Sequence, residues 1–494
     1  MKKLNTMKRT SIIIPLSLAL FSALISCKET EETPKPTPVV NLKANAGADR
    51  DVLPIQAATL DGSASTGNET KTFNWTLISK PANSKLTLAQ PTAVKPTFTP
   101  DIVGYYEFEL TVTQGSEKSQ DRVRFKVEYK EPITIDKPIN EKTHLADRFI
   151  DHIKPDYLVT KDISVNAELS VAPGVTMAFD RDKALSIEEK GIIDAVGLSE
   201  NRIRFTGMQL QKGYWAGIKL YSPSAANKMA FVNVEYGAGK IAFTNTKAGL
   251  AMFGNKKAQI SLTDCLFATN DGYGLYVQTG SLLKDFKRNS FERQSQAGIL
   301  IDAINATFLD ADSKFTGANE RDLIEVNSSI IKEETNVSWP AFKDGTKYRL
   351  LGNLEIETGW TLKPGVTVEV ERDVMISVNR NGYLSAQGIP DKKVVITGVR
   401  RNEVYWKGII IYSVSNQNVI QNAEISGGGS AIIVSGRRAN VVAYGKGAKL
   451  TIKNTRLTYS GGYGILYTSD ADVNSDAATT NTFASNNAAN VAKF

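Results

Sequence analysis

Two short stretches of the chain carry the same aromatic motif 191 residues apart. Tyr214 and Trp215 lie in GYWAGI, and Tyr405 and Trp406 lie in VYWKGI. An exposed aromatic ring has an apolar face that can stack on a sugar ring, so these four side chains are candidate ligand-binding residues. The motif also allows a structural interpretation, in which each Trp ring covers the edge of a strand.

Two acidic residues complete the set of candidate ligand-binding side chains. Glu235 in FVNVEYG and Glu424 in IQNAEISG each follow a predicted strand, and we align these two stretches with each other. Paired carboxylates across a groove are the catalytic groups of many polysaccharide hydrolases. Asp180 and Asp182 in FDRDK are a weak local match to a calcium-binding acidic cluster, for which a solvated surface turn is the alternative. Glu235 and Glu424 are the candidate binding acids, and we assign no catalytic residue.

Composition excludes several classes of protein. The 494 residues are 41% hydrophobic and 22% charged, which is typical of globular chains and long enough for two or more domains. Of the net charge of +7, four positive charges lie in residues 1–26 and leave +3 elsewhere, so the charge does not indicate a nucleic-acid partner. Two cysteines, Cys27 and Cys265, exclude a disulfide framework, and two histidines, His144 and His152, argue against a histidine-built metal site.

The N-terminus reads as a targeting segment. Basic residues precede an apolar run over Ile12–Phe21, which is short for a transmembrane helix but suits a signal peptide. The run ends in LISC, which resembles a bacterial lipobox and makes residues 1–26 a lipoprotein signal peptide. The resemblance implies that the Cys27 thiol is acylated and holds the protein in a lipid bilayer. A signal peptide with an incidental Cys is the alternative.

Residues 27–40 form a charged, Pro-rich tether. Such a segment stays extended and lifts a folded domain off the membrane. Its acidic cluster of Glu29, Glu31 and Glu32 resembles the export tag of surface-displayed lipoproteins in Bacteroidetes-type bacteria. This resemblance implies an outer-membrane, cell-surface location, with a simple solvated tether as the alternative.

Residues 41–130 show the period-two alternation of half-buried strands, for example over Phe108–Thr113 and Val123–Tyr129. Turn signals separate these short runs, and the pattern predicts a β-sandwich. The segment also resembles a polycystic-kidney-disease (PKD) domain along its length, in the stretches NAGADRDV, LDGSAS, FNWTL, PTFTPDIVGYYEFELTVT and DRVRFKVEY.

The PKD resemblance implies an Ig-like sandwich that acts as a spacer or contact module. Trp75 would then be the core tryptophan between the two sheets. Some family members hold structural calcium, which makes three acids candidate ligands: Asp49, Asp61 and Asp121.

After a linker at 131–149, residues 150–494 contain a duplication, with halves at about 150–345 and 346–494. Three pairs of stretches align at the same offset: LSVAPGVTMAF with WTLKPGVTVEV, GIIDAVG with GYLSAQG, and RIRFTG with KVVITG. Short alternating runs recur about every twenty residues between Gly, Asn, Asp or Pro, which is typical of a solenoid.

The PGV, G-x-L-x-A-x-G, I-x-F-T and W-x-G-I motifs of this segment resemble the right-handed parallel β-helix (pectin-lyase-like) family of bacterial surface proteins. The predicted fold class is therefore all-β: an Ig-like β-sandwich followed by a long right-handed parallel β-helix with an internal duplication. The resemblance leaves activity open, because β-helices include enzymes, adhesins and stalks. The Asp-Asp and His-Gly motifs of polygalacturonase-like members are missing from the sequence.

These features favour a lipid-anchored, surface-displayed protein of the cell envelope that binds polysaccharide or a surface protein without catalysis. An enzyme, namely a polysaccharide lyase or glycoside hydrolase, is the first alternative, and a purely structural stalk is the second. Convergent carboxylates with a nearby Arg or Lys would favour the enzyme, and an exposed aromatic row would favour carbohydrate binding.

Overall fold

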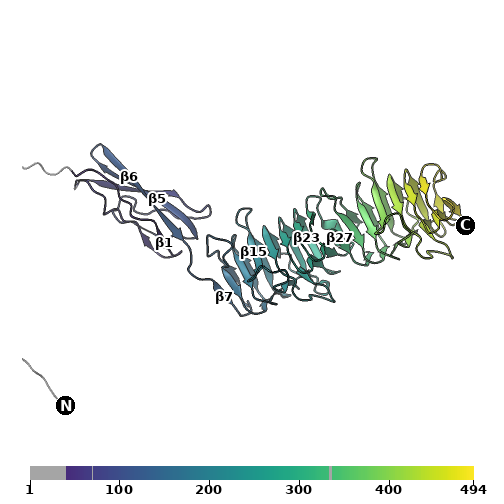
Figure 1. Ribbon diagram of the computed structural model, residues 1–494, viewed down its shortest axis with the longest axis horizontal. Coiled ribbons are helices and arrows are strands. Elements are labelled where there is room, and N and C mark those ends of the chain that lie inside the picture. Colours follow the sequence, from purple (N-terminus) through teal and green to yellow (C-terminus); the bar gives the residue numbers. More distant parts are fainter. Residues whose placement is uncertain (1–39, 69, 333–335) are drawn as a thin grey trace, which may run out of the picture.

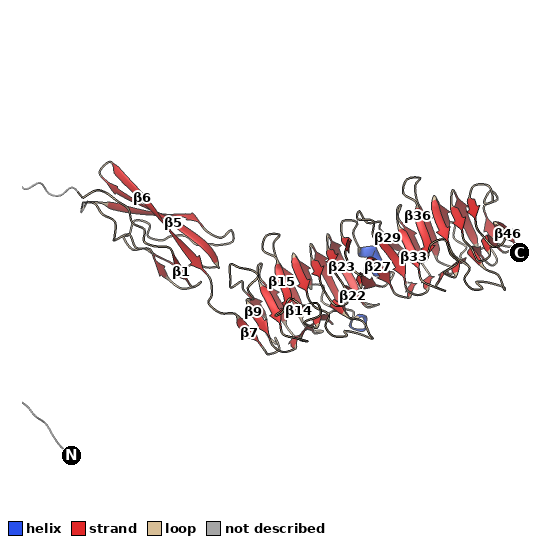
Figure 2. Ribbon diagram, in the orientation of Figure 1, coloured by secondary structure: helices blue, strands red, loops and turns tan. Residues whose placement is uncertain are grey.

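The computed structural model describes residues 40–68, 70–332 and 336–494 (Figure 1). The predicted signal peptide, Cys27 and the tether up to residue 39 lie outside the described residues. Within them, helix is limited to two short 3-10 turns, η1 (Gly254–Lys256) and η2 (Asn305–Phe308), and the rest of the regular structure is strand (Figure 2). The predicted all-β class is confirmed. No helix of the described chain is long and apolar enough to cross a membrane.

The N-terminal domain is a small sandwich. Its four-stranded sheet has the order β1-β6-β5-β3, and a two-stranded sheet joins β2 to β4. The bounds are as follows: β1 (Arg50–Val52), β2 (Ala58–Thr59), β3 (Thr72–Ser79), β4 (Thr97–Phe98), β5 (Gly104–Gln114) and β6 (Glu117–Val127). The alternating residues of β5 and β6 are buried on one face, where Phe108 and Phe125 pack with Phe98. Trp75 is 2% exposed, so the predicted core role is confirmed.

The C-terminal domain is a parallel β-helix in which each coil contributes strands to three stacked sheets. One sheet of 13 strands, which we call the long sheet, runs through the whole domain. Its strands are β10 (Ile163–Val165), β13 (Ala184–Ile187), β16 (Gly217–Leu220), β19 (Ala248–Met252), β22 (Tyr273–Val277), β25 (Ala297–Ile301), β27 (Arg321–Val326), β30 (Lys347–Leu350), β33 (Thr367–Val370), β36 (Val394–Gly398), β39 (Ala423–Ser426), β42 (Arg456–Thr458) and β45 (Thr482–Ala484).

Two sheets accompany the long sheet in the first half. The eight-stranded sheet contains β7 (Ile133–Ile135), β9 (Tyr157–Val159), β12 (Thr176–Phe179), β15 (Ile203–Gly207), β18 (Val232–Glu235), β21 (Leu266–Ala268), β24 (Ser290–Glu292) and β26 (Lys314–Gly317). The six-stranded sheet contains β8 (Thr143–Leu145), β11 (Glu168–Val171), β14 (Ile192–Val196), β17 (Lys228–Ala230), β20 (Gln259–Thr263) and β23 (Leu282–Lys287). Because β7 and β8 pair with β9 and β11, the β-helix begins inside the predicted linker 131–149.

Two other sheets replace them in the second half. The seven-stranded sheet contains β28 (Ser329–Ile331), β31 (Leu354–Ile356), β34 (Met375–Val378), β37 (Gly408–Ile411), β40 (Ala439–Ala443), β43 (Tyr463–Tyr467) and β46 (Val491–Lys493). The second six-stranded sheet contains β29 (Asn336–Trp339), β32 (Gly359–Leu362), β35 (Tyr383–Gln387), β38 (Val419–Gln421), β41 (Lys449–Lys453) and β44 (Asp472–Val473).

The core consists of rows of apolar side chains, because parallel in-register strands place each coil's inward residues above those of the coil before. One row stacks Phe267, Phe291 and Phe315 with ring centroids 5.0 and 4.9 Å apart and nearly parallel planes. Each coil buries its inner face only against its neighbours, which explains why the sequence needs many repeats to fold.

Buried side-chain amides accept hydrogen bonds from main-chain N–H groups at the corners between sheets. Gly237 N–H donates to Asn270 Oδ1 at 2.8 Å, Asn270 N–H to Gln294 Oε1 at 3.3 Å, and Gln294 N–H to Asn319 Oδ1 at 3.0 Å. Each amide side chain therefore accepts from the coil before it. A buried N–H without such an acceptor would be costly, which accounts for the many Asn residues in the turns.

The duplication is visible in the strands themselves, but the two halves are rotated relative to each other by one sheet. Strands β12 to β16 have the same lengths as β33 to β37, with bounds 191 residues apart. However, β12 lies in the eight-stranded sheet, whereas its counterpart β33 lies in the long sheet. The change occurs near η2, which packs between β23 and β29. Only the long sheet is continuous across this junction in the described β-helix.

Candidate functional site

The two repeated tryptophans lie inside the β-helix. Trp215 and Trp406 are both 0% exposed. The Nε1–H of Trp215 donates to the carbonyl of Glu235 at 2.7 Å, and that of Trp406 donates to the carbonyl of Ser426 at 2.7 Å. Each indole thus ties its own coil to the next one. A buried ring has no free face, so the structure contradicts a ligand-stacking role for these two residues.

Their tyrosine neighbours are also engaged with the protein. Tyr214 and Tyr405 are 5% and 8% exposed. Arg372 lies over the ring of Tyr405 at 4.7 Å, and the Tyr405 hydroxyl donates to Glu371 at 3.2 Å. The first half repeats this arrangement around Tyr214 with its own Arg and acid. The repeated Tyr-Trp motif therefore holds a corner together, which corrects the prediction that these tyrosines bind ligand.

The two predicted acids occupy non-equivalent positions. Glu235 pairs with Arg204, whose Nη2 lies 2.9 Å from the carboxylate, whereas Glu424 lies 3.9 Å from Arg456. The tryptophan hydrogen bonds show that the counterpart of Glu235 is Ser426, so the alignment of Glu235 with Glu424 was wrong by two residues. The structure does not bring Glu235 and Glu424 together, since one lies on β18 and the other on β39.

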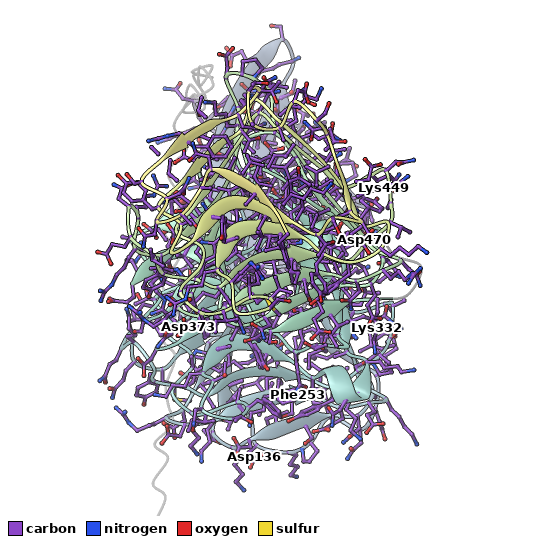
Figure 3. All side chains as sticks on the ribbon, turned by 90° about the vertical axis from the view of Figure 1, so that its right-hand side faces the viewer. Asp136, Phe253, Lys332, Asp373, Lys449 and Asp470 are labelled. Atoms are coloured by element: carbon purple, nitrogen blue, oxygen red, sulfur yellow. The ribbon has the colours of Figure 1, made fainter. Side chains whose placement is uncertain are left out.

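An aromatic cluster that the sequence analysis missed lies on the outside of the first half. We call it patch 1 and define it as Tyr221, Phe243, Phe253 and Tyr276. The rings of Tyr221 and Phe253 stack at 4.3 Å with an interplanar angle of 16°. Phe243 packs against Phe253 and Tyr276 at 6.3 and 6.4 Å. Figure 3, with the C-terminal end toward the viewer, labels Phe253 beside the stacked strands.

The second half carries the counterpart, patch 2, which we define as Tyr412, Val434, Tyr444 and Phe494. Tyr412 and Tyr444 stand 191 residues after Tyr221 and Phe253. Their rings meet edge to face at 5.9 Å, and Phe494 lies 6.4 Å from Tyr444. The two patches therefore differ in ring orientation, although both carry aromatic residues at the same two aligned positions.

A folded-back loop builds each patch. Residues 236–247 follow β18 and residues 427–438 follow β39. Each loop turns tightly, with Thr246 N–H donating to Phe243 O at 2.7 Å and Arg437 N–H to Val434 O at 2.7 Å. The loops cover external apolar clusters on the outer faces of the long and seven-stranded sheets. They leave apolar side chains in solvent: Phe243 is 39% exposed, Ile241 54% and Ile432 55%, and Tyr412 beside the second loop is 39% exposed.

A shallow groove of about 810 Å³ crosses the first six-stranded sheet. Short side chains on β17 and β20 form its floor, and charged side chains form its walls. Its acids are already paired within the protein: Asp194 lies 3.4 Å from Lys228, and Asp285 lies 3.5 Å from Lys287. Such compensated ion pairs at an open surface are typical of a solvated sheet face rather than of a catalytic acid and base.

The candidate calcium ligands serve as local anchors. Asp49 accepts the N–H of Arg124, Asp121 accepts the N–H of Ala46, and Asp61 accepts from a nearby serine and pairs with a lysine. No group of three or more His, Cys, Asp or Glu side chains in the described chain is arranged to hold a metal ion.

Cys265, the cysteine within the described residues, lies in the core of the first half. Its side chain is 1% exposed, and this burial raises the pKa of its thiol to about 12. A thiol that stays protonated and enclosed is a poor nucleophile, so Cys265 packs rather than reacts.

Fold and site together define an all-β protein in which an N-terminal sandwich precedes a parallel β-helix with two aromatic patches on its outer faces. Residues 46–127 match a family model that describes a PKD domain. This part of the chain belongs to the PKD domain family. A PKD domain indicates an extracellular adhesion or scaffold role.

Solved structures resemble the same part of the chain. The PKD domain from the KIAA 1837 protein is 31% identical and aligns over 18% of this chain and 90% of its own, with a TM-score of 0.17. The PKD domain from human KIAA0319 is 23% identical over 21% and 97%, with a TM-score of 0.17. A nucleoside hydrolase-related hypothetical protein from Saccharophagus degradans, associated with carbohydrate metabolism, is 14% identical over 18% and 25%, with a TM-score of 0.16. The comparison with curated proteins finds no match.

Proposed function

We propose that the protein is a non-enzymatic binding scaffold of the bacterial cell envelope, and that its two aromatic patches bind a neutral polysaccharide. One observation carries this proposal: the chain builds an aromatic patch twice at equivalent positions on its outer surface. Phe243 and Tyr412 are each 39% exposed, and Tyr221 and Tyr444 are half-buried. Contiguous exposed apolar surface on a soluble domain marks an interaction site. A repeated site suits a ligand that is itself a repeating polymer.

The chemistry of the patches favours a sugar without charge. A pyranose whose hydroxyls are all equatorial presents C–H groups on both ring faces, and such a face matches the flat apolar face of Tyr or Phe. Burial is the main cause that raises the pKa of Tyr221 and of Tyr412, so both phenols are neutral at physiological pH. Arg437 lies over the ring of Phe494 at 4.3 Å, so Tyr412 and Tyr444 supply the rings for the sugar in patch 2.

The proposed location rests on the N-terminal sequence. The signal peptide and LISC motif support acylation of Cys27, and the acidic tether supports display on the outer membrane. In this arrangement the PKD domain is the spacer between the anchor and the β-helix. Metabolic labelling with a radioactive fatty acid tests the anchor: the wild type becomes labelled, and Cys27→Ser does not. Label retained by Cys27→Ser would refute it.

Affinity electrophoresis of the soluble protein that starts after Cys27 tests the binding function. We expect hydroxyethylcellulose, a neutral β-glucan, to retard the protein, and polygalacturonate to leave it unretarded. The double variant Tyr221→Ala/Tyr412→Ala should lose the retardation. Tyr105→Ala is the matched control, because Tyr105 is 48% exposed but lies on the PKD domain.

Three results would overturn this function. The first is no retardation by the neutral polymer, which would leave a stalk or a protein-contact surface. The second is retardation that persists in the double variant, which would place the sugar elsewhere. The third is release of reducing ends or unsaturated uronates from any tested polymer, which would indicate the lyase or hydrolase alternative.

A further inference from the structure

The two patches are far apart along the β-helix. Patch 1 uses residues that follow strands β16 and β19, and patch 2 uses residues that follow β37 and β40. Along the long sheet, the coil that contains β37 lies seven strand steps beyond β16, because β37 directly follows β36. Seven steps of about 4.8 Å separate the patches by about 34 Å along the axis. A short oligosaccharide therefore fills one patch at a time.

The patches also lie on different sheets. Patch 1 covers the outer face of the long sheet, and patch 2 covers the outer face of the seven-stranded sheet, which begins only at β28. This follows from the one-sheet rotation between the halves. A flat, rigid surface can rest on one sheet face, whereas a single dissolved chain can bend from one face to the next.

The surface between the patches carries charges that pair with one another. They form a ladder on the long sheet, where β27, β30 and β33 are neighbours. Arg321 contacts Glu325 at 2.6 Å, and Arg349 contacts Glu369 at 2.7 Å, with both carboxylates buried. Their hydrogen-bonding capacity is used within the protein, so contacts to a polymer concentrate at the two aromatic patches.

We infer that both patches bind one soluble, flexible polysaccharide chain at the same time, so that the duplicated β-helix acts as a bivalent clamp. This inference rests on the proposed function. Once one patch holds the chain, the second binding event is intramolecular. It then depends on the effective local concentration of the chain and not on the concentration of free polymer in solution. Linked sites of this kind exceed the affinity of either site alone by about 10²- to 10⁴-fold.

Calorimetry with two probes tests the clamp, using the soluble protein that starts after Cys27. Cellotetraose is too short to bridge the patches, and hydroxyethylcellulose is long enough. We expect cellotetraose to bind with a stoichiometry of two, and the polymer to bind about 10²- to 10⁴-fold more tightly per tetrasaccharide unit. Tyr221→Ala and Tyr412→Ala, each alone, should reduce the stoichiometry for cellotetraose to one and remove the extra affinity for the polymer.

A polymer also binds more tightly per unit simply because it offers many overlapping sites. That statistical gain is the same for the wild type and for each single variant, so a loss of polymer affinity in the variants reports the bridging alone. Val414→Ala is the matched control, since Val414 is 40% exposed near patch 2 but is not part of it. Circular dichroism confirms that each variant is folded. The control should keep both the stoichiometry and the polymer affinity.

The outcomes separate the inference from the function on which it rests. Cellotetraose binding at two sites with less than a tenfold gain for the polymer would overturn the clamp and keep the binding function. Loss of polymer affinity in only one of the two single variants would also overturn the clamp. No binding of either probe would overturn the proposed function itself. Equal binding to microcrystalline cellulose and to the soluble polymer would contradict the requirement for a flexible chain.

Discussion

The buried tryptophans allow a sharp test of why the Tyr-Trp motif is repeated. Trp406 and Trp360 both lie in the second half and are both 0% exposed. Trp406 Nε1 donates to the Ser426 carbonyl, whereas Trp360 Nε1 is buried with no hydrogen-bond acceptor among the described residues. Replacement of each by Phe removes the same atoms from similar surroundings. The two variants therefore differ chiefly in one hydrogen bond.

The expected magnitudes follow from this difference. In Trp406→Phe, the lost hydrogen bond costs about 1–3 kcal/mol, because the Ser426 carbonyl loses its indole donor. The smaller ring adds a cavity cost of about 1–2 kcal/mol. In Trp360→Phe the cavity cost is similar, but the variant also removes an unpaired buried N–H, whose burial costs about 1–3 kcal/mol. We expect Trp406→Phe to be less stable than Trp360→Phe by about 2–6 kcal/mol.

Urea denaturation followed by far-UV circular dichroism measures the difference. The two positions lie in the same half, so a loss of cooperativity between the halves affects both variants equally. A lower midpoint for Trp406→Phe with an unchanged slope is the expected result. Equal midpoints would refute the view that the indole hydrogen bond is the reason for tryptophan in the motif.

Three further predictions concern the core, the charge ladder and the free thiol. A Cβ on Gly382 would lie 2.3 Å from the Ile356 carbonyl oxygen, so Gly382→Ala should lower the free energy of unfolding by about 3 kcal/mol in urea. Gly436→Ala, where a Cβ meets no atom within 4 Å, should lose about 1 kcal/mol, and a similar loss in both would contradict the steric argument. Burial opposes ionisation of Glu369, but hydrogen bonds from Arg349 and Lys347 outweigh it and lower its pKa below the usual 4.5. This carboxylate therefore stabilises the fold above pH 4.5 and loses that contribution as pH falls through its folded pKa, so Glu369→Gln should flatten the acid limb of a pH–stability curve. An unchanged acid limb would show that other groups dominate. Burial raises the pKa of Cys265 to about 12, so in the soluble protein that starts after Cys27 iodoacetamide at about pH 8 should label it only in denaturant. Labelling of Cys265 in the native protein, detected by mass spectrometry, would contradict its burial.

The sequence patterns predicted the fold class well because strands and turns are local. The alternation in Phe108–Thr113 and in Val123–Tyr129 predicts which side chains lie on the buried face of each strand. The burial pattern of β5 and β6 confirms this prediction. The repeat offset likewise predicted matched strands in both halves. The rotation by one sheet could not be predicted, because it depends on how many strands the junction near η2 contributes, and no residue type encodes that number.

The candidate site was predicted poorly for a related reason. Trp215 and Trp406 were prominent because they are large and repeated, yet a repeated Trp serves the core as well as a surface. Tyr221 and Phe253 carried the same offset and were a detectable signal. Both residues lie just beyond strand ends on an outward sheet face, where Phe253 is 6% exposed and packs against the half-buried Tyr221. This arrangement becomes visible only when the coils are stacked.

The continuity of the long sheet has a mechanical consequence. At the junction between the halves, two of the three walls of the tube end and are replaced by others, while the third passes through without a break. A tube with one unbroken wall bends most easily about that wall, so the continuous long sheet acts as the hinge between the two halves. Among the sheets of the described β-helix, only the long sheet therefore carries a hydrogen-bonded ladder across the junction, where the contacts of η2 with β23 and β29 add to it. We expect a pulling force along the rod to separate the molecule there first.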